Sequence, residues 1–209
     1  MSKLKIIIKT LSPIIISENN GDRNTTETKD YIPGTTVLGL FVHKYIKKNN
    51  LKGDNIPLTD DFYELFLHNK LIFTNCYPYR DNKIFEPVPF SLQKDNDNEN
   101  KIINLFENKN KKTSSIKFGH IYKNKIYGVE VEKTLNFHHN KYFNDRKGNN
   151  NNNSAIFNYE AIKENQEFCG FIKGEEEDLN KIKELFENEE TTYIGKSKTA
   201  DRKSTRLNS

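Results

Sequence analysis

A loop that leads into an apolar run, Tyr31 to Gly39, holds the residues best suited to bind an anion. Pro33 and Gly34 cannot continue a regular element and Thr35 is a good helix N-cap, so the sequence predicts a helix that begins here. The first N–H groups of a helix have no partner within it, and with the positive end of the helix dipole they favour a phosphate or another anion. Gly34 would let the backbone approach such a group closely.

A polar arc along the same predicted helix extends this surface. At about 100° per residue, apolar side chains in residues 37–46 cover most of the helix circumference, which predicts a helix wedged into a core. The remaining arc carries Thr36 and Gly39 near the helix start, and the basic His43 and Lys47 one to two turns further on. We expect this arc to be a functional surface. The alternative is the solvated face of an ordinary core helix.

The segment that follows Ile194 offers a second set of phosphate ligands. Phosphate oxygens could bind there to the backbone N–H groups of a glycine turn, a hydroxyl and two cations. These groups belong to Gly195, Ser197, Lys196 and Lys198. Two solvated loop lysines are the alternative interpretation.

The overall composition neither requires nor excludes a nucleic-acid partner. The formal net charge is +4, and without residues 201–209 it is +2, from 30 basic and 28 acidic residues, so an electrostatic argument must rest on local clusters. Cys76 and Cys169 lie in apolar contexts without CxxC spacing or a signal peptide, which indicates a reducing cytoplasm and gives no support for a metal site. We expect no cofactor. No apolar run approaches the roughly 20 residues of a membrane span.

Four Asn/Lys-rich segments are expected to be disordered surface insertions because they can bury little apolar surface: residues 19–30, 94–101, 108–115 and 147–153. Codon bias in an AT-rich genome would explain them, and flexible loops that contact RNA are the alternative. Residues 201–209 resemble the in-frame translation of a common sequencing adapter and show no apolar periodicity, so we expect them to lie outside the fold.

The periodicity of the other segments predicts one α+β domain in residues 1–200. The expected elements are a strand in 4–16, the helix from Thr35, a short helix after Thr59, strands in 71–77 and 88–92, a hairpin in 117–133, a strand in 166–172, a helix from Glu175 and a last strand in 192–195. A βαββαβ ferredoxin-like domain with insertions would give this order. In such a fold the first helix and the last strand pack together, which would bring both candidate phosphate sites onto one surface.

Seven segments resemble, in the same order, motifs of the RAMP superfamily of CRISPR-associated proteins. They are Ile32 to Gly39, Phe62 to Pro78, Pro87 to Ser91, Asn136 to Asn140, Ile156 to Ile162, Gln166 to Gly174 and Ile194 to Ala200. The chain most resembles the larger RAMP subunit of type III-D effectors, which is similar to the subunit that caps the guide RNA. Leu38 stands where many relatives carry an Arg, and the glycine-rich loop of the family does not continue past Ala200. We therefore expect an N-terminal fragment.

The resemblance implies an RRM-like RAMP domain in a ribonucleoprotein of the prokaryotic cytoplasm that serves antiviral defence. Its expected partners are CRISPR RNA, other RAMP subunits and, indirectly, target RNA, with no membrane. On this reading the chain is a non-catalytic subunit that holds the RNA backbone with the first helix, with the loop from His138 to Arg146 that includes Lys141, and with the turn after Ile194.

Metal-independent cleavage of guide RNA is the first alternative. Some RAMP proteins cleave RNA through a His general base and a basic residue that stabilises charge. The candidates here are His43, His138 and His139, with Lys141 or Arg146 nearby in sequence. If His138 and His139 lie on a strand, they point to opposite faces and cannot act as a pair.

A structural or protein-binding subunit without direct RNA contact is the second alternative. The hairpin expected in residues 117–133 would then be its docking edge. RNA binding with a strong salt dependence would count against this hypothesis, because phosphate contacts release counterions.

Overall fold

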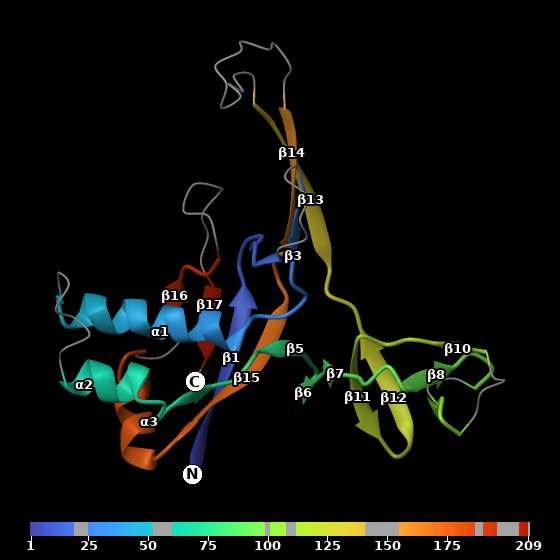
Figure 1. Cartoon of the computed structure of the whole chain (residues 1–209), viewed down its shortest axis with the longest axis horizontal. Coiled ribbons are helices and arrows are strands. Elements are labelled where there is room, and N and C mark those ends of the chain that lie inside the picture. The colour runs from blue at the N-terminus through green and yellow to red at the C-terminus, as the bar shows by residue number, and fades with distance from the viewer. Residues whose placement is uncertain are drawn as a thin grey trace.

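The computed structural model describes residues 1–18, 25–51, 60–98, 101–107, 112–140, 155–186, 190–195 and 205–208. Figure 1 shows three parts: a main sheet with helices beside it, a long hairpin that projects from the sheet, and a lobe of short strands. The architecture is mixed α+β and rich in strands, as the sequence predicts. No helix in these ranges is long and apolar enough to cross a membrane.

The main sheet has the strand order β16-β17-β1-β15-β5-β6, and β4 also pairs with β15. Its strands are β1 (Ser2–Thr10), β4 (Ile72–Phe73), β5 (Tyr77–Arg80), β6 (Lys83–Ile84), β15 (Glu167–Gly174), β16 (Glu190–Thr192) and β17 (Thr205–Asn208). Successive side chains of a strand point to opposite faces, so β1 buries Ile6 and Ile8 on one face and leaves Lys3 and Lys5 exposed on the other. The alternation in the sequence predicts this strand correctly.

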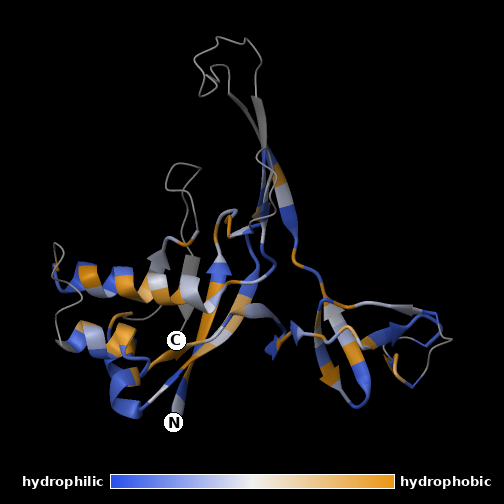
Figure 2. Ribbon diagram, in the orientation of Figure 1, coloured by the Kyte–Doolittle hydropathy of each residue, from blue (hydrophilic) through white to orange (hydrophobic). Residues whose placement is uncertain are grey.

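The helices cover the face that carries Ile6 and Ile8. They are α1 (Gly34–Lys48), α2 (Asp60–Phe62) continued by the π-helix η2 (Tyr63–Leu67), and α3 (Glu176–Lys183). The ring of Phe41 in α1 packs edge-on against Phe186 just after α3 at a centroid distance of 4.7 Å, and against Phe73 of β4 at 5.6 Å. The core therefore lies between the helices and one sheet face (Figure 2).

The projecting hairpin consists of β13 (Lys133–Asn140) and β14 (Ala155–Ile162), paired antiparallel along both strands, with β3 (Thr25–Thr28) parallel to β14 and β2 (Ser17–Glu18) on β3. The lobe holds two three-stranded sheets, β12-β11-β7 and β10-β8-β9. Its strands are β7 (Glu86–Pro87), β8 (Leu92–Asp95), β9 (Ile102–Asn104), β10 (Thr113–Ser114), β11 (Phe118–Tyr122) and β12 (Lys125–Val129). The hairpin expected in residues 117–133 is confirmed as β11 and β12.

Parts of the Asn/Lys-rich segments are ordered, contrary to the prediction. Strands β3 and β10 lie within them, and β8 ends within one. Asp95 is buried, its side chain accepts a hydrogen bond from the N–H of Asp97 at 3.0 Å, and its own N–H donates to the carbonyl of Lys101 at 3.0 Å, as ladder bonds do. Backbone pairing thus supplies the order that apolar burial does not. Residues 19–24, 99–100, 108–111 and 147–153 lie outside the described ranges.

Residues 205–208 differ from the expectation that they stand outside the fold, because they form β17 between β1 and β16. An edge strand presents unpaired N–H and C=O groups that any extended segment can meet, whatever its side chains. This explains why no apolar pattern marks the strand. The adapter origin of residues 201–209 stays a prediction, and β17 interrupts a plain βαββαβ strand order.

Candidate nucleic-acid interface

The start of α1 uses its first N–H groups within the chain. The N–H of Gly34 donates to the side-chain oxygen of Asn75 at 2.8 Å, and the N–H groups of Thr36 and Val37 both donate to the carbonyl of Pro33. Pro33 is the N-cap and has no side chain that could accept a hydrogen bond, so the prediction that Thr35 is the N-cap is wrong. The anion-site hypothesis for this helix start therefore loses two of its donors, the N–H groups of Gly34 and Thr36, since the bond from Val37 is an ordinary intrahelical bond.

Gly34 is needed for packing against the sheet. It is buried, and a Cβ at this position would lie 2.1 Å from the carbonyl oxygen of Phe73. Real Cβ atoms do not come that close to a backbone oxygen, so only glycine lets α1 begin against the end of β4. Close approach of an RNA backbone is not required to explain this residue.

The polar arc of α1 faces solvent as the periodicity predicts. Thr35, Gly39, His43 and Lys47 are exposed and Thr36 is half-buried, whereas the opposite side of the helix is in the core. A Cβ at Gly39 would meet nothing within 4 Å. The arc is thus an open stripe with two basic side chains, and its contact with RNA stays a prediction.

The predicted loop from His138 to Arg146 begins on the projecting hairpin. His138 lies opposite Phe157 and His139 opposite Ile156 in the β13–β14 ladder, so the backbone of both histidines belongs to a strand, which is the condition that the sequence analysis set for them. Lys141 and Arg146 lie outside the described residues.

The glycine turn after Ile194 meets the base of the hairpin. Gly195 has a φ of +106°, and a Cβ there would lie 2.7 Å from the carbonyl oxygen of Ile15. The neighbouring Ile14 pairs through its N–H and C=O with Ile162 at the end of β14. The structure therefore brings the turn and the hairpin base together, while the start of α1 contacts Asn75. Lys196, Ser197 and Lys198 lie outside the described residues.

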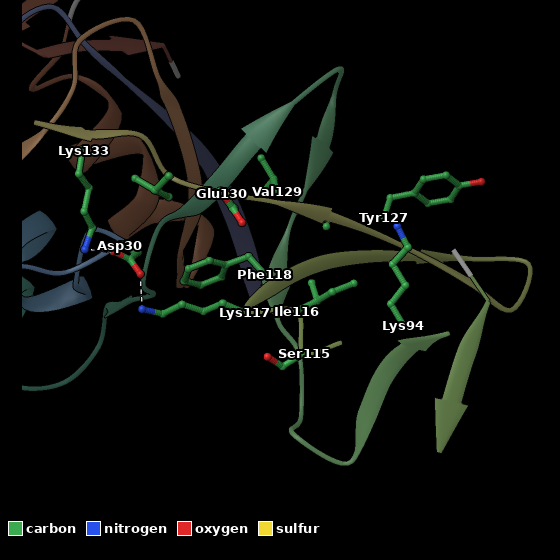
Figure 3. Close-up of a pocket in the computed structure, with 12 residues that line it drawn as sticks. Asp30, Lys94, Ser115, Ile116, Lys117, Phe118, Tyr127, Val129, Glu130 and Lys133 are labelled. Carbon is green, nitrogen blue, oxygen red and sulfur yellow. Dashed lines mark hydrogen bonds and ion pairs between the residues drawn. The ribbon is translucent and has the colours of Figure 1, made fainter. Parts of the chain in front are cut away.

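A charged cluster that the sequence does not predict joins the three parts of the molecule (Figure 3). Asp30, just before α1, forms ion pairs with Lys117 of the lobe and with Lys133 of β13. The ammonium of Lys133 also lies 3.0 Å from the carboxylate of Glu160 in β14 and donates to the carbonyl of Thr28 at 3.1 Å. These residues are far apart in sequence, so no local pattern signals the cluster.

The cluster borders a cavity of about 670 Å³ whose other walls come from β8, β12 and the segment before β11. Burial raises the pKa of Asp30, but hydrogen bonds from Lys117 and Lys133 outweigh it, so this pKa lies below its ordinary value. Burial lowers the pKa of Lys133, and its bonds to Asp30 and Glu160 raise it above its ordinary value. The charges at this end of the cavity are therefore locked in mutual pairs and suit a structural role rather than proton transfer.

In the part of the chain that the structure describes, no group of three or more His, Cys, Asp or Glu side chains could hold a metal ion. Both cysteines are buried and unpaired. Burial raises the pKa of Cys76 to about 12 and that of Cys169 to about 11, so both thiols are poor nucleophiles and poor metal ligands near neutral pH.

Comparisons with known proteins agree with the fold. A family model described as the RAMP superfamily matches residues 7–200. No curated protein matches the sequence. Among solved structures, a chain of a type IV-B CRISPR complex has 8% identity and a TM-score of 0.51, with 99% of this chain and 89% of that chain covered.

Two further structures have lower TM-scores. A chain of the type III-B Cmr-beta complex bound to cognate target RNA and AMPPnP has 11% identity and a TM-score of 0.47, over 99% of this chain and 62% of that chain. Cmr4 (Cas7) of Pyrococcus furiosus has 11% identity and a TM-score of 0.41, over 99% and 98%. With a family model that spans most of its length, this chain belongs to the RAMP superfamily of CRISPR-associated proteins.

Proposed function

We propose that this chain is a non-catalytic RNA-binding subunit of a type III CRISPR effector ribonucleoprotein, in which it holds the backbone of CRISPR RNA for antiviral defence. The observation that carries the proposal is the exposed arc of α1. On a helix whose other sides pack into the core, Thr35, Gly39, His43 and Lys47 face solvent. These residues contribute nothing to packing, and small polar and basic side chains in a row suit contacts to phosphate and sugar.

The finer assignment rests on the resemblance of the motifs to the larger RAMP subunit of type III-D effectors. Two observations support a ferredoxin-like arrangement into which β17 is inserted. In the main sheet, β15 pairs with β1, β4 and β5, and the helices α1 and α3 both lie on one face of this sheet. The partners in this proposal are CRISPR RNA, other RAMP subunits and, indirectly, target RNA, in the cytoplasm of a prokaryote.

Fluorescence anisotropy with a labelled CRISPR RNA tests the proposal on the wild-type chain and on Lys47→Ala. We expect Lys47→Ala to weaken binding and to lower the slope of log affinity against log salt by about 0.7, the value for one lost phosphate contact on a single strand. Lys123→Ala is the matched control, because Lys123 is an exposed lysine at the tip of the β11–β12 turn. Equal affinities of the two variants would contradict the role of the arc.

A denaturing gel of the same RNA separates the alternatives. The proposal expects RNA that is shifted but intact. Shortened RNA, with the cut abolished by His43→Ala or His138→Ala, would establish an endoribonuclease instead. RNA that is neither shifted nor shortened would favour a structural subunit that docks through β11 and β12.

A further inference from the structure

The main sheet has a second face that none of the described helices covers. β1 and β15 turn Ile6, Ile8 and Ile172 toward the helices, and the alternate positions point the other way. We call this second surface the open face; its described members include Lys3, Lys5, Ile7 and Lys9 of β1, Glu167, Cys169, Phe171 and Lys173 of β15, Ile72 of β4, and Tyr77 and Tyr79 of β5. It carries four lysines and one carboxylate.

Two lysines of the open face oppose each other directly. Lys3 and Lys173 are partners in the β1–β15 register, both are exposed, and like charges directly opposite on neighbouring strands destabilise a sheet. The carboxylate of Glu167 lies near Lys9, with an N–O distance of 3.9 Å, at the other end of the ladder. A local arrangement that works against stability is expected where a function requires it.

Aromatic rings hold two of these ammonium groups over the sheet. The Nζ of Lys3 lies 5.2 Å from the ring centroid of Phe171. The Nζ of Lys5 lies 4.5 Å from the ring centroid of Tyr79 and donates to its hydroxyl at 2.7 Å. Because ammonium groups already lie over these rings, the surface offers cations to a ligand rather than bare rings for base stacking.

The spacing of the cations suits a linear polyanion. Lys3 and Lys5 are two residues apart on one strand, roughly 6.6 Å, and Lys173 extends the row across the sheet at a strand spacing of about 4.8 Å. We propose that the open face binds the phosphate backbone of single-stranded RNA without sequence preference, as a surface separate from α1. The proposed function enters only as the reason for taking RNA as the polyanion.

Lys173→Glu gives the sharpest test, because it separates stability from binding. Opposite charges at the Lys3–Lys173 pair stabilise the sheet, so the thermal midpoint is expected to rise while affinity for a fluorescein-labelled oligouridine falls about tenfold at low salt. The double variant Lys3→Glu/Lys173→Glu is expected to lower the salt slope by about 1.4. Lys123→Glu makes the same charge change as Lys173→Glu on the lobe, so it controls for net charge.

Each outcome of the anisotropy measurement decides the proposal. Weaker binding by Lys173→Glu than by Lys123→Glu, with a raised midpoint, supports it. Equal binding by these two variants overturns it. If Lys47→Ala still weakens binding in that case, the RNA-binding role proposed for α1 holds without a second RNA surface. A wild-type chain that does not bind RNA overturns both, and affinity that depends on the base sequence overturns the backbone assignment.

Discussion

Gly34 and Gly39 lie in the same helix five residues apart, and substitution of each by alanine is expected to change stability in opposite directions. A Cβ at Gly34 would lie 2.1 Å from the carbonyl oxygen of Phe73, so the start of α1 or the end of β4 must shift. Overpacking of this kind costs about 1–3 kcal/mol, and strain on the bond from Gly34 to Asn75 adds about 1 kcal/mol. The lower chain entropy of alanine in the unfolded state offsets up to about 1 kcal/mol.

The net expectation for Gly34→Ala is a loss of about 1–4 kcal/mol in the free energy of unfolding. Gly39→Ala meets nothing within 4 Å in the middle of a helix, so it is expected to gain about 0.5–1 kcal/mol. Urea unfolding followed by far-UV circular dichroism measures both values under the same conditions. Gly39→Ala is the matched control because it makes the same chemical change in the same helix.

A Gly34→Ala chain as stable as the wild type would refute this reasoning. If that chain then failed to bind RNA, glycine would be present for approach of a phosphate, as the sequence suggests, and the contact with Phe73 would be incidental. A loss of stability together with normal RNA affinity at a temperature where the variant is folded would assign Gly34 to packing alone.

Two further predictions concern titratable groups. Asp30→Asn is expected to cost about 1–3 kcal/mol at pH 7, between the values for exposed and buried ion pairs, because it removes the carboxylate that pairs with Lys117 and with the half-buried Lys133 and leaves Lys133 with Glu160 alone as its acidic partner. The pKa of Asp30 is lowered in the folded state, so its contribution to stability is fully present above the ordinary pKa of 3.8 and is lost as pH falls through the folded pKa. Urea unfolding should therefore show that the stability difference between wild type and Asp30→Asn shrinks in that pH range. Cys76 and Cys169 should react with a thiol reagent only after unfolding, and stability should fall as pH rises above the ordinary thiol pKa of 9.0, because the unfolded thiols ionise first. Rapid labelling of the folded chain near pH 8 would contradict their burial.

Features that depend on periodicity along one segment could be predicted from the sequence. The apolar positions of α1 and α3 repeat at helical spacing, and Leu179 and Ile182 are buried as that spacing requires. The alternation of β1 predicts both its buried and its lysine-bearing face. The exposed arc of α1 follows from the same reasoning, because a position that is not apolar in a core helix can only face solvent.

Features that depend on partners distant in sequence could not be predicted. The acceptor for the N–H of Gly34 is the side chain of Asn75, in the connection between β4 and β5, so the local signal for a Thr35 cap was misleading. The Asp30 cluster and the Lys3–Lys173 pair exist only once the register of the strands is fixed. β17 carries no side-chain pattern because its place depends on backbone pairing with β1.

The two candidate RNA surfaces lie on opposite sides of one layered domain, and this limits how they can work together. The arc of α1 is on the side of this helix that points away from the sheet. The open face, with Lys3 and Lys173, is on the other side of the sheet and points in the opposite direction. A short RNA can therefore occupy only one surface at a time, and substitutions on the two surfaces should act independently on its binding. A longer RNA that passes around the edge of the sheet could bind both surfaces at once, and the effective concentration of the second segment would raise its affinity. Substitutions that abolish binding at either surface would remove this gain. If lengthening the RNA brings no such gain, the two surfaces hold separate strands.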